Sequence, residues 1–162
     1  MAYPGLESYL TDHLAGATAG VNLSAMASQE HRADEHGAFF GEIASEIKAD
    51  YATLQKLIDE LNIEKSATKT AAAEIGSKVM APKFTGGDDD ELNAFIALET
   101  LSMGVEGKIC MWKALKTVAD AYPTLEGYDL DELIARGESQ RERIESTRLA
   151  IAPQALAHTA NV

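Results

Sequence analysis

The stretch EHGAFFGEIASEIKADYATLQKLIDEL, residues 35–61, decides the fold class of this chain. Its core positions alternate by three and four residues, at Phe40, Ile43, Ile47, Asp50, Leu54, Leu57 and Leu61. This spacing puts these side chains on one face of an α-helix and is typical of a helix packed in a bundle. We therefore predict a long helix over residues 35–61.

The rest of the chain carries further helical patterns. Helices are predicted over residues 5–28, 64–80, 89–121 and 130–152. Prolines fall at or near the predicted ends, and the acidic run 88–91 marks a strong helix start because carboxylates favour the positive end of the helix dipole. Strand patterns are absent, so the sequence predicts an all-α protein.

The lengths of the connections predict the topology. Two long helices joined by a tight turn are followed by a connection of about 27 residues and then by two more long helices. A helix over 64–80 advances ~25 Å, and the extended residues 81–87 add roughly 20 Å, which is enough to cross the whole bundle. We expect one domain over residues 1–162, an all-α four-helix bundle of two antiparallel hairpins with a long crossover that carries a short extra helix.

Composition limits the partners and the compartment. Asp and Glu number 26 against 14 Lys and Arg, and the resulting net charge of −12 would repel nucleic-acid phosphates. Residues 1–7 lack the pattern of a secretory signal, and no apolar run of about 18 residues suggests a membrane span. The single cysteine, Cys110, suits a reducing compartment. We expect an acidic cytoplasmic protein without nucleic-acid or membrane partners.

Four charged residues fall inside the apolar patterns of the last two long helices. At 100° per residue, Glu99 and Glu106 point inward from one helix, and Arg141 and Arg148 point inward from the other. Facing residues of an antiparallel hairpin share a constant sum of residue numbers, which pairs Glu99 with Arg148 and Glu106 with Arg141. Buried carboxylates need neutralisation, so we predict a buried Glu/Arg network.

The same construction extends the network into the first hairpin. It places His13 level with Asp50, and Glu46 lies one turn away at the edge of the apolar face. A histidine opposite a carboxylate resembles an oriented base, but no nucleophile accompanies it, so no catalytic residue is predicted. We expect a structural or binding role rather than an enzyme, and the ligand stays unknown.

Two hairpins, a long crossover and inward carboxylates on several helices resemble the ferritin-like superfamily over residues 5–157. The stretches DHLAGATAGV (12–21) and LSMGVEGK (101–108) are similar to an uncharacterised bacterial branch of that superfamily. The resemblance implies a four-helix bundle. Di-iron members carry a Glu on each of two helices and Glu-x-x-His on each of the other two.

The chain lacks the metal-binding motif of the di-iron members. Ala49 stands three residues after Glu46, and Arg141 stands three residues after Glu138, so neither position offers an imidazole. We therefore expect no cofactor and no metal. The pairs Glu30-His31 and Glu35-His36 near the first turn could bind a surface metal but are expected to face solvent.

Two alternatives stay open. One is a divergent metal-binding oxidase or metal-handling protein that holds iron or manganese with His13, Glu46, Asp50, Glu99 and Glu106. The other concerns assembly, since the weakly amphipathic segments 64–80 and 153–162 could serve a homodimer.

Overall fold

The computed structural model describes residues 4–63 and 89–157. These residues form four α-helices, α1 (Pro4–Glu30), α2 (Gly37–Glu60), α4 (Asp90–Thr117) and α5 (Leu130–Ala157), and two short 3-10 helices, η1 (Ala119–Ala121) and η2 (Pro123–Gly127). Within these two ranges there is no strand, which confirms the all-helical prediction. The predicted helix over 64–80 and nearly all of the crossover lie outside the described residues.

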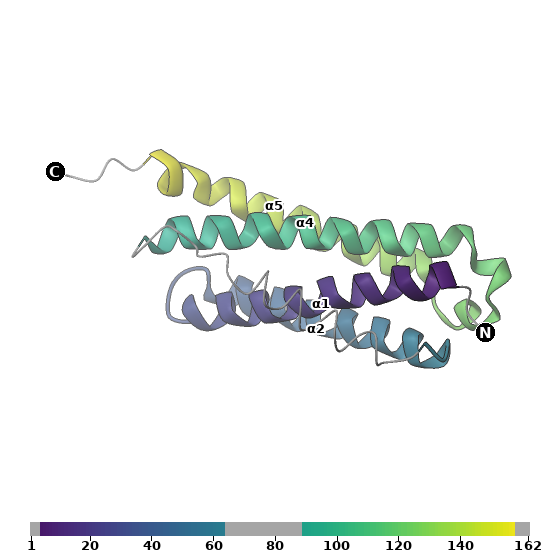
Figure 1. Ribbon diagram of the computed structural model, residues 1–162. Coiled ribbons are helices and arrows are strands. Elements are labelled where there is room, and N and C mark those ends of the chain that lie inside the picture. The colour runs from purple at the N-terminus through teal and green to yellow at the C-terminus, as the bar shows by residue number, and fades with distance from the viewer. Residues whose placement is uncertain (1–3, 64–88, 158–162) are drawn as a thin grey trace.

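The helices pack as two pairs (Figure 1). α1 lies along α2, α4 lies along α5, and the pairs meet where α1 contacts α4. Ion pairs between α4 and α5 join Glu99 to Arg148, Glu106 to Arg141, Lys113 to Glu138 and Lys116 to Asp131. In these four pairs, a higher residue number on α4 goes with a lower residue number for its partner on α5.

Local sequence signals place the helix starts well and the helix ends less well. The Asp89 side chain accepts a hydrogen bond from the Leu92 amide at 3.0 Å, and the Asp129 side chain accepts one from the Glu132 amide at 2.9 Å. α4 ends at Thr117, before the predicted residue 121, and α5 continues through Pro153. A proline near a helix end removes one hydrogen bond, which water can replace on an exposed face.

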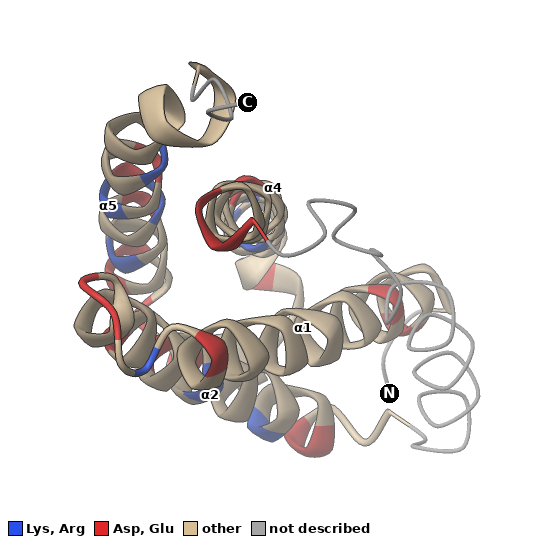
Figure 2. Ribbon diagram, turned by 90° about the vertical axis from the view of Figure 1, so that its left-hand side faces the viewer, with Lys and Arg blue, Asp and Glu red and all other residues tan. Residues whose placement is uncertain are grey.

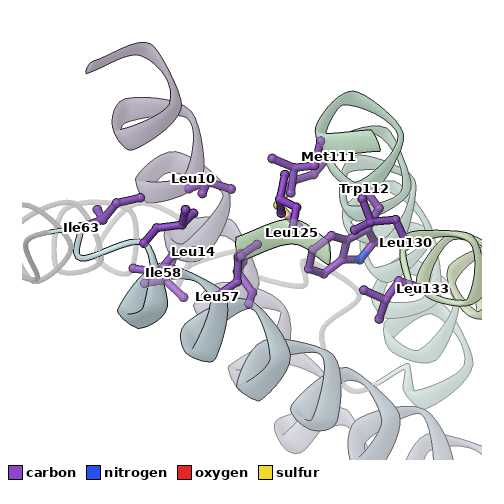
Figure 3. Close-up of a cluster of buried hydrophobic side chains, with 13 residues drawn as sticks. Leu10, Leu14, Leu57, Ile58, Ile63, Met111, Trp112, Leu125, Leu130 and Leu133 are labelled. Atoms are coloured by element: carbon purple, nitrogen blue, oxygen red, sulfur yellow. The ribbon is translucent and has the colours of Figure 1, made fainter. Parts of the chain in front are cut away.

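The core consists of two apolar clusters arranged along the bundle. Figure 3 shows the first, in which Leu10, Leu57 and Trp112 from three helices converge, with Leu125 of η2 beside them. The second gathers residues such as Phe40, Leu98 and Ile144. Between the two clusters α2, α4 and α5 carry polar residues, namely Asp50, Lys108 and Gln140.

α4 and α5 approach closely at Gly137, which is buried. A Cβ atom added there would lie 2.8 Å from Cγ1 of the buried Ile109. Because real Cβ contacts are essentially never this short, the packing of the two helices at this level depends on glycine.

Candidate functional site

A buried carboxylate, Asp50, is the centre of the polar layer between the two apolar clusters. It lies on α2 and is 5% exposed. Lys108 of α4 donates to its Oδ2 atom, and Arg136 of α5 donates to its Oδ1 atom. The Gln140 side chain of α5 also donates to Oδ2, at 3.0 Å. Asp50 thus ties three helices together, and both of its oxygens are occupied.

Gln140 closes this arrangement into a ring. Its side chain is fully buried, with Oε1 accepting from Lys108 Nζ while Nε2 donates to Asp50. Buried charges are tolerated only with such partners, because an unpaired ion in the interior costs several kcal/mol. Burial lowers the pKa of the Lys108 ammonium, and the attraction of Asp50 opposes that change. We call Asp50, Lys108, Arg136 and Gln140 the Asp50 network.

A cavity of about 410 Å³ lies beside the Asp50 network, between α1, α2 and α4. Asp50 and Lys108 form part of its wall. Apolar side chains such as Leu54, Leu101 and Trp112 form much of the rest. The volume falls within the range of about 300–1,000 Å³ that is usual for small-molecule sites.

Glycines of α1 and α4 line the edge of this cavity, and two of them, Gly16 and Gly104, are exposed. Gly16, Gly104 and Gly107 all line it, and a Cβ added at any of them would meet no atom within 4 Å beyond its own helix neighbourhood. At Gly20 the nearest atom, Ile47 Cγ2, lies 3.9 Å away. The small residues of α1 thus differ, because Gly16 borders open space whereas Ala15 is 2% exposed and Gly20 is within van der Waals reach of Ile47 on α2.

His13 lines the same cavity as Asp50. Its ring packs edge-on against Tyr9, with 4.5 Å between the ring centroids. Burial lowers the pKa of His13, and the nearby Asp12 carboxylate opposes this only in part, so the neutral imidazole is favoured. His13 and Asp50 were predicted to lie level, and both line this cavity. The hydrogen bonds of Asp50, however, go to the other members of the Asp50 network.

The predicted Glu/Arg pairs form, but most of their side chains are not buried. Glu99 Oε2 lies 3.1 Å from Arg148 Nη1, and Glu106 Oε2 lies 3.0 Å from Arg141 Nε. The predicted burial is wrong for three of the four residues, because 50–53% of the Glu99, Glu106 and Arg141 side chains is exposed. α4 is apolar around much of its circumference, so the helical pattern alone does not show which edge faces the core.

The fourth residue of that set, Arg148, is held at the edge of the bundle. Its side chain is 18% exposed, lies over the Phe95 ring at 5.1 Å, and bonds Glu145 at 2.6 Å as well as Glu99. Red and blue residues recur along α5 in Figure 2, whereas most of α1 is tan. Exposed pairs of this kind contribute only about 0–1 kcal/mol each.

The five residues of the alternative metal set do not form one cluster. Asp50 is bound by the Asp50 network. Both oxygens of Glu46 accept from Arg143 Nη2, at 2.6 and 2.7 Å. Glu99 and Glu106 lie on the outer face with their arginines, and His13 faces the cavity. A metal site built from these residues would first have to displace five cationic side chains, namely Lys108, Arg136, Arg141, Arg143 and Arg148.

Sequence reasoning missed Lys108, Arg136, Gln140 and Arg143. For Gln140 a signal is present, because it continues the three-and-four spacing of Leu133, Gly137 and Ile144. The register that pairs Glu106 with Arg141 also brings Lys108 level with Gln140 to within one residue. Gln140 and Lys108 could therefore have been found from the sequence, because Gln140 is a polar residue at a core-facing position and the Glu106–Arg141 register places Lys108 near it.

The turn between α1 and α2 holds a smaller polar group. The prediction that the histidines of this turn face solvent is wrong, because His31 is 4% exposed and the His36 side chain 13%. The His31 ring stacks on Phe40, and its Nδ1 lies 2.6 Å from Asp34 Oδ2, so its polar atom has a partner inside the fold. His36 Nε2 lies 3.4 Å from Glu91 Oε2, and Glu35, His36 and Glu91 present possible metal-ligand atoms within 4.8 Å of one another. Because the Glu35 side chain is 82% exposed, this group is open to solvent and weaker as a site than the cavity.

Comparisons with protein-family models, curated proteins and solved structures give no match. Among the described residues, no helix combines the length and the apolar character that crossing a bilayer requires. The cavity and the Asp50 network are therefore the features of the molecule that bear on its function.

Proposed function

We propose that this protein is a ferritin-like bundle of two antiparallel hairpins that binds a small, largely apolar molecule in the cavity beside Asp50. In this proposal the Asp50 network takes the place of a metal centre. Support for the topology comes from the two helix pairs and from the opposite order of ion-paired residues along α4 and α5.

The observation that carries the binding role is the open space at Gly16, Gly104 and Gly107. Glycine inside a helix is about 0.8–1.0 kcal/mol less favourable than alanine. An added methyl group would meet no neighbouring atom at any of these positions, so packing does not require glycine there. Gly16 and Gly104 are exposed, so the space beside them is the solvent-open side of the cavity, where a ligand can enter and approach the helix backbone.

The electrostatics of the network disfavour a bound cation in the same place. Both oxygens of Asp50 already accept hydrogen bonds from Lys108, Arg136 and Gln140. A metal ion at Asp50 would face two positive side chains at short range and would leave them without their partner. The cavity side chains therefore fit an organic ligand better than iron or manganese.

The test uses N-phenyl-1-naphthylamine, a neutral apolar probe of about 17 non-hydrogen atoms whose fluorescence rises when it leaves water. We expect saturable binding of one probe per chain. Gly104→Leu should abolish it, because the new side chain enters the cavity from a position where its Cβ meets no obstacle.

The matched control is Ala25→Leu, which adds a similar side chain at an exposed position of α1 that does not line the cavity. It should bind the probe as the parent chain does. Unsaturable binding, or equal binding by the Gly104→Leu variant, would refute the assignment of the cavity as the binding site.

A further inference from the structure

We propose that the ligand of this cavity is an amphipathic anion, with an apolar body of about ten carbon atoms and one carboxylate-like group held at Lys108. This inference rests on the proposed binding function and specifies the chemistry of the ligand. Two observations support it, namely the charges of the cavity wall and the hydrogen-bonding groups that remain free there.

The Asp50 network carries a surplus positive charge. One carboxylate, Asp50, is shared by two cations, Lys108 and Arg136. The neighbouring Glu46 pairs with Arg143, which Glu42 also approaches at 3.8 Å with a side chain that is 68% exposed to water. Asp12 also lines the cavity, but its side chain is exposed and therefore screened by water. Asp50, Lys108 and Arg136 together are one positive charge in excess, and Lys108, at 16% exposed, is the more buried of the two cations, because Arg136 is 39% exposed.

At the Asp50 network the hydrogen-bonding capacity left over is that of a donor, whereas the acceptor Asp12 lies on the exposed part of the wall. An ammonium group has three N–H bonds, and Lys108 uses two of them on Asp50 Oδ2 and Gln140 Oε1. The oxygens of Asp50 are occupied, so Asp50 has little capacity to receive a donor from a ligand. A neutral His13 carries one further N–H in the same wall. A ligand that accepts hydrogen bonds matches this wall, and an anion matches its charge as well.

The size and lining of the cavity define the rest of the molecule. An engineered cavity of about 150 Å³ accommodates benzene. The present cavity of about 410 Å³ has two to three times that volume, which is more than an apolar body of about ten carbon atoms requires. Leu54, Leu101 and Trp112 offer an apolar wall to that part of the ligand.

The experiment measures displacement of N-phenyl-1-naphthylamine by decanoate, decanol and decylamine, which share one chain length and differ in the charge of the polar end. A hydrogen bond to a charged group contributes enough to change affinity by about tenfold or more. We expect decanoate to bind at least about tenfold more tightly than decanol, and decylamine to bind most weakly.

Variants locate the charge that produces this order. Lys108→Met should bring decanoate and decanol to similar affinities, and Arg136→Met should reduce the preference in the same direction without altering a residue that lines the cavity. Lys113→Met is the matched control, because Lys113 lies on the same helix, pairs with Glu138 on the surface and does not line the cavity. If Lys108→Met fails to fold, the Arg136 variant decides the question.

Each outcome has a separate meaning. Decanoate preference that depends on Lys108 or Arg136 supports the inference. Equal affinities for the three compounds, or a preference for decylamine, would overturn the inference and leave the binding function intact. If neither the probe nor any of the three compounds binds, the proposed function itself fails.

Discussion

Replacing a single cavity glycine by alanine should make this protein more stable. In Gly104→Ala, the helix gains about 0.8–1.0 kcal/mol of propensity because residue 104 lies inside α4. The added methyl group meets no atom within 4 Å, so no packing penalty offsets the gain. For a domain of this size the melting temperature should rise by about 2–4 °C per kcal/mol.

Gly137→Ala, on the neighbouring helix, provides the opposite case. The same gain in propensity applies inside α5, but the new Cβ would lie 2.8 Å from Cγ1 of the buried Ile109. Overpacking of this kind costs typically 1–3 kcal/mol. After the gain in propensity is subtracted, the free energy of unfolding should fall by up to about 2 kcal/mol.

Urea denaturation followed by circular dichroism measures both variants under the same conditions. The two should differ by about 1–3 kcal/mol, with Gly104→Ala above the parent chain and Gly137→Ala at or below it. If Gly104→Ala destabilises the protein as much as Gly137→Ala does, the space beside Gly104 is filled in solution. The cavity, and the function proposed for it, would then lose their physical basis.

Three further predictions concern the polar groups. Gln140→Leu should lower the free energy of unfolding by about 1–3 kcal/mol because it removes a partner from both Asp50 and Lys108, whereas Arg141→Met on the exposed face should change it by less than about 1 kcal/mol in the same denaturation assay. The pKa of His13 is lowered in the folded state, so the parent chain should lose stability relative to His13→Leu as the pH falls below 6.5, and a constant difference from pH 7.5 to about pH 5 would contradict this. Removal of metal ions with EDTA should leave the melting temperature unchanged, and a marked decrease would favour the metal-binding alternative.

The helices themselves were largely predictable, because their signals are local. The apolar spacing of residues 35–61 corresponds to α2, and the side chains of Asp89 and Asp129 cap α4 and α5 as their positions indicate. The pairing of Glu99 with Arg148 was also within reach, because a hairpin fixes which residues are level. The predicted burial of most of these charged side chains was wrong, because a residue near the edge of a helix face can lie either in the core or in solvent.

The candidate site could be predicted only in part. Asp50 and His13 were singled out, and both line the cavity. Lys108 and Arg136 were not, because a lysine or arginine in an amphipathic helix ordinarily extends into solvent. Their inward role depends on the position of Asp50 on another helix, 58 and 86 residues away in sequence.

The order of residues along the chain thus determined that it forms long helices, where those helices start, and which charges stand level between neighbours. These properties follow from backbone geometry over a few turns. Only the tertiary structure decided which charges are buried and where space is left. Both depend on how each helix is rotated against the others, and the cavity exists because small side chains from α1 and α4 face the same point from separate helices.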